Sequence, residues 1–176
     1  MKTYLLGLIY SLTFIVSYAQ AQSPSSTRFW VSPGIGKATY PSMMIAMAIE
    51  PANTKTILSG RFSVNGEWIM HDTPGIRTAE WGLLYGRRLN NILVSAGVSY
   101  LSGAARGNYL YTDPNPYLGT GKVYEKINYQ TIGIPMEVRY IAALKHVGIG
   151  LTAFGNVNTK RSFIGLNVSL YAGKMK

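Results

Sequence analysis

QTIGIPMEVRY, residues Gln130–Tyr140, has two different faces in strict alternation. The even-numbered positions are apolar or aromatic: Ile132, Ile134, Met136, Val138 and Tyr140. The odd-numbered positions are small or charged: Thr131, Gly133, Pro135, Glu137 and Arg139. Alternation over this length predicts a β-strand with a different environment on each side. Because the polar face is mostly small, we predict a crowded polar interior on one side and lipid on the other, as in a membrane β-barrel.

The same alternation recurs in seven other stretches, so the sequence predicts eight strands and no stretch with a sustained helical period. Side chains predicted to face outward include Phe29, Ile45, Leu58, Trp81, Tyr85, Val94, Tyr100, Ile149 and Ile164. Outward aromatic residues predict a girdle at each membrane interface, with Phe29, Tyr85 and Tyr140 at one and Trp81 and Tyr100 at the other. A soluble lipocalin-like barrel is the alternative fold, but it would hold its large apolar residues inside.

The predicted connections after strands two, four and six are short, and those after strands three and five are long. Outer-membrane barrels have short periplasmic turns and long outer loops, so we predict that both termini are periplasmic. Residues 87–91 are predicted to form a turn. The longest stretch without a strand pattern, Gly103 to about Asn128, is predicted to be an irregular loop. Pro135 cannot donate to a strand ladder, so we predict a bulge there.

Composition agrees with a chain that has little water-facing surface. The 176 residues suffice for one domain, and only 14% of them are charged, against roughly 25% in soluble domains. The absence of Cys excludes a disulfide framework and a thiol nucleophile. The formal net charge is +10, but the cations fall in turns and loops without one basic face. We therefore predict lipid phosphates, lipopolysaccharide included, or acidic polysaccharides as partners instead of nucleic acid.

The first 21 residues have the pattern of a secretory signal peptide. Lys2 precedes the uncharged, mostly apolar run Tyr4–Tyr18, and Ala19-Gln20-Ala21 is a small-x-small cleavage site. The apolar run is short for a membrane-spanning helix, which needs about 20 residues. We predict a cleaved signal peptide over residues 1–21 and a barrel domain over residues 22–176.

Four stretches carry a resemblance to a known family: EWGLLYGRRL at Glu80–Leu89, VSAGVSYLSG at Val94–Gly103, TIGIPMEVRY at Thr131–Tyr140 and FIGLNVSLYAGK at Phe163–Lys174. Through them the chain resembles the outer-membrane β-barrel domains of Gram-negative bacteria, the PorT-like group of the porin superfamily. The resemblance implies an eight-stranded up-and-down barrel in the outer membrane and no shared catalytic residues. Many such barrels end in an aromatic residue that the barrel-assembly machinery recognises; Tyr171 is the nearest candidate here.

Four charged residues fall on the predicted inward face, with Glu50 and Glu67 near strand ends: Arg61, Glu80, Glu137 and Arg139. An Arg facing lipid at mid-depth would cost about 2–4 kcal/mol, so these side chains are expected to point inward and pair. One interpretation is a structural salt-bridge network that closes a narrow lumen. The other is the lining of an ion path, which would make the protein a narrow porin-like channel for small solutes. Opposite signs in equal number favour the closed network.

The predicted loop between Gly103 and Asn128 is the candidate interaction surface. Its aromatic and basic side chains suit a polysaccharide, a lipid headgroup or a protein partner: Arg106, Tyr109, Tyr111, Tyr117, Lys122, Tyr124 and Lys126. The alternative is a surface loop without a ligand.

A barrel enzyme acting on lipid is a third interpretation. His71 and Asp72 could act as base and orienting residue, with Thr73 or Ser102 as nucleophile, but no GxSxG motif supports them. The sequence predicts neither a cofactor nor a metal. The main hypothesis is a non-enzymatic, integral outer-membrane barrel with a structural or surface-interaction role through its outer loops.

Overall fold

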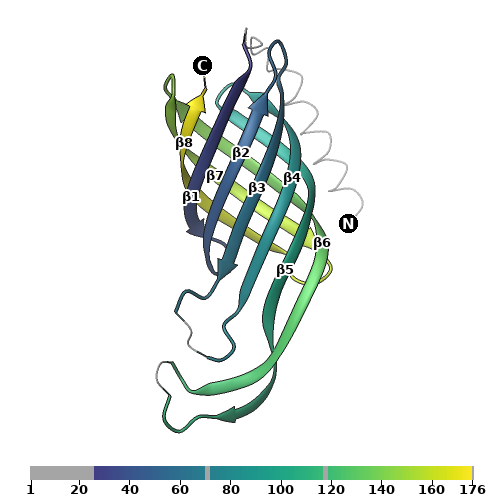
Figure 1. Ribbon diagram of the computed structural model, residues 1–176, viewed down its shortest axis with the longest axis vertical. Helices are drawn as coiled ribbons and strands as arrows, with labels where there is room; N and C mark the ends of the chain where they lie inside the picture. Colours follow the sequence, from purple (N-terminus) through teal and green to yellow (C-terminus); the bar gives the residue numbers. More distant parts are fainter. Residues whose placement is uncertain (1–25, 70–71, 117–118, 176) are drawn as a thin grey trace, which may run out of the picture.

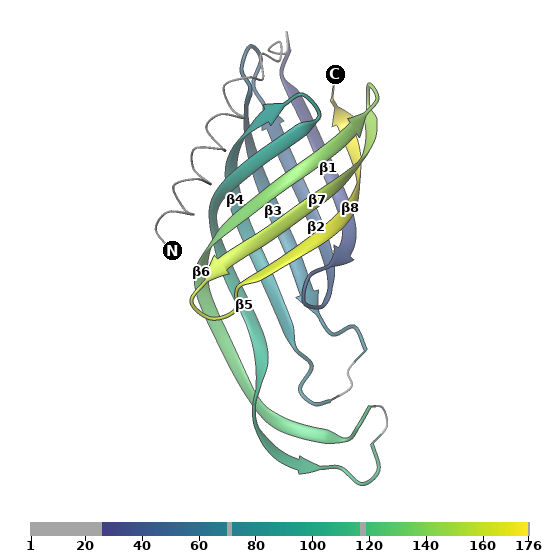
Figure 2. The ribbon, with the colours of Figure 1, turned by 180° about the vertical axis from the view of Figure 1, so that it is seen from behind.

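A computed structural model describes residues 26–69, 72–116 and 119–175; the predicted signal peptide, residues 1–21, lies outside this range. The described chain forms a closed antiparallel barrel in which each strand pairs with the next in sequence and β8 pairs with β1 (Figures 1 and 2). The strands are β1 (Arg28–Lys37), β2 (Pro41–Glu50), β3 (Thr56–Gly66), β4 (Arg77–Leu89), β5 (Ile92–Thr112), β6 (Lys122–Ala143), β7 (Val147–Asn158) and β8 (Phe163–Lys174). No helix in these three ranges is long and apolar enough to span a membrane.

The two faces of the wall have the polarity that the alternation predicts. Outward side chains such as Ile45, Leu83 and Val168 are half or more exposed, and buried polar residues outnumber buried apolar ones. The opposite distribution would mark a soluble lipocalin-like barrel, so that alternative is wrong. A wall with hydrocarbon side chains outside and Ser, Asn, Arg and Glu inside is stable only where the surrounding medium is apolar. The fold is therefore an eight-stranded transmembrane β-barrel.

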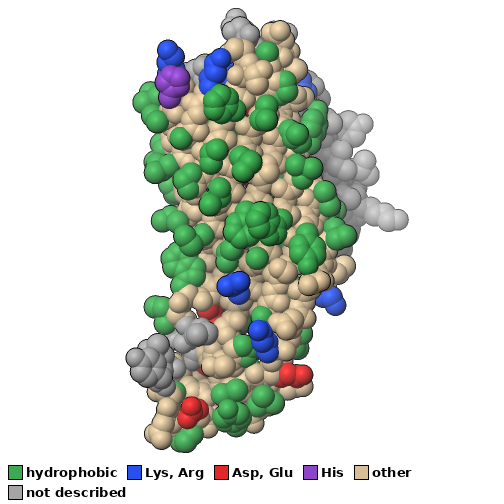
Figure 3. All heavy atoms as spheres, in the orientation of Figure 1, with side chains coloured by type: hydrophobic (Ala, Val, Ile, Leu, Met, Phe, Trp, Pro, Cys, Tyr) green, Lys and Arg blue, Asp and Glu red, His purple; other side chains and the backbone are tan. Residues whose placement is uncertain are grey.

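Two arginines on β4 mark the edges of the apolar belt. Arg77 and Arg87 are both exposed, and the outward residues between them are Ala79, Trp81, Leu83 and Tyr85. At about 3.3 Å per residue and a tilt of about 40°, ten residues rise roughly 25 Å, the height of a typical outer-membrane apolar band. Figure 3 shows hydrophobic side chains over the middle of one face, with charged side chains towards its two ends.

The aromatic residues predicted to form girdles are all outward and exposed. Trp81 pairs with Tyr100 across β4 and β5 and packs against Phe62 at a ring distance of 4.3 Å. Trp81 and Tyr85, however, lie only four residues apart on β4. On this strand the two arginines therefore mark the membrane interfaces better than the aromatic residues do.

The predicted irregular loop between Gly103 and Asn128 is wrong over most of its length. β5 continues to Thr112 and β6 begins at Lys122, so the two strands form a hairpin that extends well beyond the barrel (Figure 1). Register shifts occur on either side of Tyr109. Gly, Pro and Asn in this stretch hide the alternation, while hydrogen bonds between the two strands still form.

Two smaller predictions are also wrong. Residues 87–89 belong to β4, and only Asn90 and Asn91 form the turn, which Asn90 enters with a φ of 56°. Pro135 causes no bulge: the β5–β6 register is the same on both sides of it, and two residue pairs are simply missing there. A missing N–H interrupts a ladder without requiring an extra residue.

The barrel has two distinct ends. The hairpin end carries the β5–β6 hairpin and the β3–β4 loop. The short-turn end carries the turns between β2 and β3, β4 and β5, and β6 and β7. The start of β1 and the end of β8 lie side by side at the short-turn end, since Phe29 pairs with Lys174.

Candidate functional sites in the lumen and at the hairpin end

The lumen brings together the four charged residues that the alternation placed on the inward face. Arg61 on β3, Glu80 on β4, and Glu137 and Arg139 on β6 have fully buried side chains. Arg61 Nη2 donates to both carboxylate oxygens of Glu80, at 2.8 and 2.9 Å, and its Nη1 donates to Glu137 Oε2 at 3.2 Å. Arg61 thus bridges two carboxylates on strands that are not neighbours, β4 and β6.

The second arginine, Arg139, pairs with Glu137 on the same strand, β6. Arg139 Nε donates to Glu137 Oε1 at 2.7 Å, and Nη2 donates to Oε2 at 2.8 Å. Its Nη1 donates to Ser32 Oγ and to the Tyr171 hydroxyl, each at 3.2 Å. Two positive and two negative side chains therefore balance inside the barrel, with each carboxylate held by an arginine.

Neutral side chains donate further hydrogen bonds to the two carboxylates. Ser63 donates to Glu80, Ser95 donates to Glu137, each at 3.0 Å, and Asn156 Nδ2 donates to Glu80 at 2.6 Å. Phe154 lies 5.7 Å from the Arg61 guanidinium. A buried ion pair is stable only with such additional hydrogen bonds, because desolvation of the charges is costly. We refer to Arg61, Glu80, Glu137 and Arg139, with Ser63, Ser95 and Asn156, as the lumen network.

Between the lumen network and the short-turn end lies a layer of apolar side chains. Its members are at most 4% exposed: Trp30, Ala46, Ala48, Ile57, Leu93, Ile141, Tyr171 and Met175. The rings of Trp30 and Tyr171 meet edge to face at 5.0 Å. Tyr171, the nearest candidate for a terminal aromatic signal, thus lies inside the lumen.

Another ion pair lies in the lumen at the short-turn end. Arg88 Nε donates to Glu50 Oε2 at 2.6 Å, and Trp30 Nε1 donates to Glu50 Oε1 at 3.0 Å. Arg28 Nη1 lies 3.9 Å from the same carboxylate. The sequence predicts that Glu50 faces inward, but it does not predict the partner Arg88, because residues 87–91 are predicted to form a turn. Extending the strand alternation to Leu89 would have placed Arg88 on the inward face.

The candidate interaction residues fall into two groups. Arg106 forms partly buried contacts with the β3–β4 loop, and the other described candidates lie on the exposed part of the hairpin. Arg106 donates to both Glu67 oxygens, at 3.0 and 2.6 Å, and to the carbonyl oxygens of Asp72 and Pro74. Its guanidinium lies 5.8 Å from the Tyr124 ring. Arg106 therefore joins the hairpin to the β3–β4 loop.

The remaining candidates lie further along the hairpin. Tyr109 and Tyr124 are paired residues whose rings meet edge to face at 5.8 Å. Tyr109 and Tyr111 are more than half exposed, as is Leu110 between them. Lys122 and Lys126 are exposed on β6. Tyr117 lies outside the described residues.

The structure does not assemble the proposed enzyme residues. His71 lies outside the described residues, and Ser102 faces outward on β5. Asp72 accepts a hydrogen bond from Thr120 Oγ1 and lies 3.8 Å from Arg106. The Thr73 backbone pairs with β6 at Lys122 and Tyr124. Within the described ranges, no group of three or more His, Cys, Asp or Glu side chains could hold a metal ion.

No protein-family model and no curated protein sequence matches the chain. Solved structures do. A major outer membrane protein from Thermus thermophilus superposes with a TM-score of 0.63 at 11% identity, covering 84% of this chain and 98% of that one. The N-terminal β-barrel domain of Pseudomonas aeruginosa OprF superposes with a TM-score of 0.49 at 7% identity, covering 86% and 99%. The specific resemblance to PorT-like barrels stays a prediction. At this level of identity, the Thermus thermophilus structure shows that the chain shares its fold, an eight-stranded transmembrane barrel, with outer-membrane proteins.

Proposed function

We propose that this protein is a non-enzymatic barrel of the outer membrane that is closed to solutes and presents the β5–β6 hairpin outside the cell. The observation that carries the proposal is the filled lumen. The lumen network crosses the barrel, and the apolar layer lies between it and the short-turn end. An eight-stranded barrel is just wide enough for side chains to fill its interior.

Conductance of the refolded full-length protein in planar lipid bilayers tests this closure. The closed barrel is expected to give no reproducible conductance steps at neutral pH. The simultaneous exchange of Trp30, Arg61 and Arg139 for Ala removes the three largest obstructions and should produce steps, which shows that the assay detects an opened lumen. Regular steps from the unaltered protein would favour the narrow porin-like channel.

The hairpin supports a surface-interaction role. β5 pairs with β4 only as far as Ala104, and β6 pairs with β7 only from Gly133. Beyond these points the two strands pair with each other. They are held to the β3–β4 loop by Arg106 with Glu67 and by backbone hydrogen bonds of Thr73 with β6. A long, anchored hairpin with exposed Tyr109, Leu110 and Tyr111 suits contact with a polysaccharide or a protein.

The same end supports contact with lipopolysaccharide. Arg77, at the edge of the belt, lines a groove of the outer wall together with Trp68 and Lys126. Cations beside an interfacial aromatic residue are suited to the phosphates of the outer leaflet. Insertion would depend on the barrel-assembly machinery, as for other outer-membrane barrels.

Single cysteines test the location and the orientation, because the chain has none of its own. With Leu110→Cys, a membrane-impermeant maleimide should label intact cells. With Lys145→Cys, in the β6–β7 turn, labelling should require disruption of the outer membrane. The reverse pattern would place the hairpin in the periplasm, and no labelling of either variant before lysis would contradict exposure at the cell surface.

A further inference from the structure

The charges at the two ends of the barrel are distributed unequally. At the short-turn end the described residues include six cations and one acid: Arg28, Lys55, Arg87, Arg88, Lys145 and Lys174, with Glu50. Glu50 is 2% exposed and turned inward to Arg88 and Trp30. In the described part of the chain, the outward rim at this end therefore presents basic side chains without an acidic one. At the hairpin end, four acids accompany the cations: Glu67, Asp72, Asp113 and Glu125.

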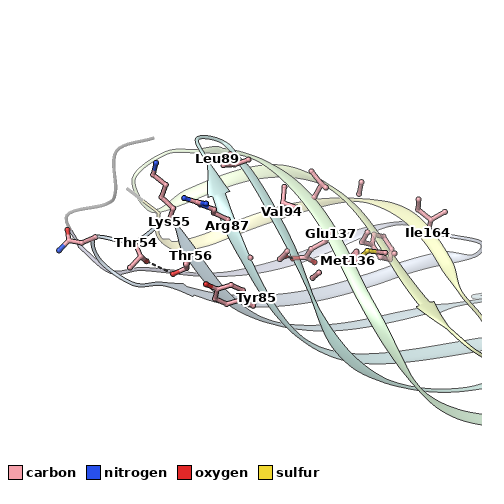
Figure 4. Close-up of a pocket in the computed structure, with 18 residues that line it drawn as sticks. Thr54, Lys55, Thr56, Tyr85, Arg87, Leu89, Val94, Met136, Glu137 and Ile164 are labelled. Atoms are coloured by element: carbon pink, nitrogen blue, oxygen red, sulfur yellow. Dashed lines mark hydrogen bonds between the residues drawn. The ribbon is translucent and has the colours of Figure 1, made fainter. Parts of the chain in front are cut away.

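A groove on the outer wall begins at this basic rim. Its polar end is formed by residues 53–55 of the β2–β3 turn, by Thr56 and by Arg87, and its apolar part includes Val94, Met136 and Ile164 (Figure 4). Lys55 and Arg87 lie at the same end of the barrel, where the Arg88 backbone N–H donates to the Lys55 carbonyl at 2.8 Å. The groove therefore changes from basic to apolar along its length.

The apolar part is hollow because small residues alternate with large ones across the outer wall. Tyr85, Ala96, Met136, Gly155 and Ile164 follow one another across five neighbouring strands. Ala96 and Gly155 leave hollows between the three larger side chains. Ala153, two residues from Gly155 on β7, extends the second hollow towards the short-turn end. This part of the wall lies in the apolar belt, where hydrocarbon is the medium available to fill it.

We propose that this groove is a binding site for an anionic glycerophospholipid of the leaflet at the short-turn end. The lipid phosphate lies beside Arg87 and Lys55, and an acyl chain lies over Ala96, Ala153 and Gly155. A net negative headgroup is selected over a zwitterionic one because the described rim has no outward acid to attract a choline or an ethanolamine group. The inference rests on insertion into a membrane, and it does not depend on the closed lumen or on the role of the hairpin.

Native mass spectrometry of the full-length protein tests the site. The protein is refolded in detergent with equal amounts of phosphatidylglycerol and phosphatidylcholine, and the retained lipid adducts are counted. Phosphatidylglycerol should be retained in preference. Each cation near a membrane surface favours an anionic lipid by about fivefold, so Arg87→Gln together with Lys55→Gln should lower that preference by about 25-fold.

The matched control is Lys37→Gln together with Lys160→Gln, which removes two exposed lysines from the hairpin end of the barrel and should leave the preference unchanged. Ala153→Phe fills the hollow without altering charge and should lower retention of both lipids. Equal retention of the two lipids by the unaltered protein, or an equal loss of preference in the Lys37 and Lys160 control, would overturn the proposal. Electrophoresis of boiled and unboiled samples identifies any variant that fails to fold, and conductance reports on the closed lumen separately.

Discussion

Arg139 holds both carboxylate oxygens of Glu137, a residue only two positions away on β6, through Nε at 2.7 Å and Nη2 at 2.8 Å. Neighbours of the same parity on a strand point to the same face, so this pair is formed within one strand and needs no other element to bring it together. Arg61 from β3 then joins it to Glu80 on β4. The network thereby links β3, β4 and β6 across the lumen.

Arg61 and Glu80 are expected to act as a coupled pair in stability. Arg61→Met leaves Glu80 buried without its arginine and should cost about 3–5 kcal/mol in the free energy of unfolding. Glu80→Gln should also destabilise, and the double variant should lose about 1–3 kcal/mol less than the sum of the two single changes. Urea unfolding in lipid vesicles, followed by tryptophan fluorescence, measures these values. Ser59→Ala, a buried lumen position outside the network, is the control and should be nearly neutral. Additive losses would show that the two charges act independently.

Gly36 is expected to be essential for closing the barrel between β1 and β8. A Cβ at this position would collide with the Leu166 carbonyl oxygen and the Asn167 side chain on the neighbouring strand. Gly36→Val should therefore lower the yield of the compact, heat-modifiable form in electrophoresis. Gly60→Ala is the control, because a Cβ there would meet only Met47 Cγ at an ordinary 3.7 Å. If the Gly36 variant gave the same compact band at the same yield, the close approach of β1 and β8 would be refuted.

Charges placed on the outer wall should have effects that depend on depth. Leu83→Arg puts a guanidinium midway between Arg77 and Arg87 and should cost about 2–4 kcal/mol in the free energy of unfolding. Ser102→Arg, near the edge of the belt, should cost about 0–1 kcal/mol. Urea unfolding of both variants in vesicles provides the comparison. Equal costs at the two positions would contradict the proposed placement of the bilayer.

The hairpin beyond Arg106 is expected to be dispensable for the barrel. Joining Arg106 to Lys126 through Asn-Gly removes residues 107–125 and keeps the contact of Arg106 with Glu67. Because none of the removed residues belongs to the lumen network or to the apolar layer, the free energy of unfolding should change by less than about 1 kcal/mol. The same urea titration measures this change. Arg106→Ala in the full-length chain shows, for comparison, how much the Arg106–Glu67 ion pair contributes. A collapse of the barrel after truncation would show that the hairpin is part of the folding unit.

Alternation of side chains predicted most of the fold and part of the site. Residues such as Arg61, Glu80, Glu137 and Arg139 stand at inward positions of their strands, so their place in the lumen follows from parity. The extended hairpin was not predictable in this way, because a stretch with Gly, Pro and Asn loses its alternation while its backbone groups still pair. Arg88 was missed because a strand end cannot be separated from a turn when both are polar, whereas the inward position of Glu50 follows from the alternation of β2.

The sequence by itself determined the number of strands, the face that each side chain occupies and the polarity of the two environments, since these depend on the order of residues along one strand. Tertiary structure decided which charges pair, how far the hairpin extends and where the barrel closes. Contacts such as Arg61 with Glu137 join residues 76 positions apart, and they depend on the register between strands. The register depends on how all eight strands pair around the barrel, and no single stretch of sequence contains that information.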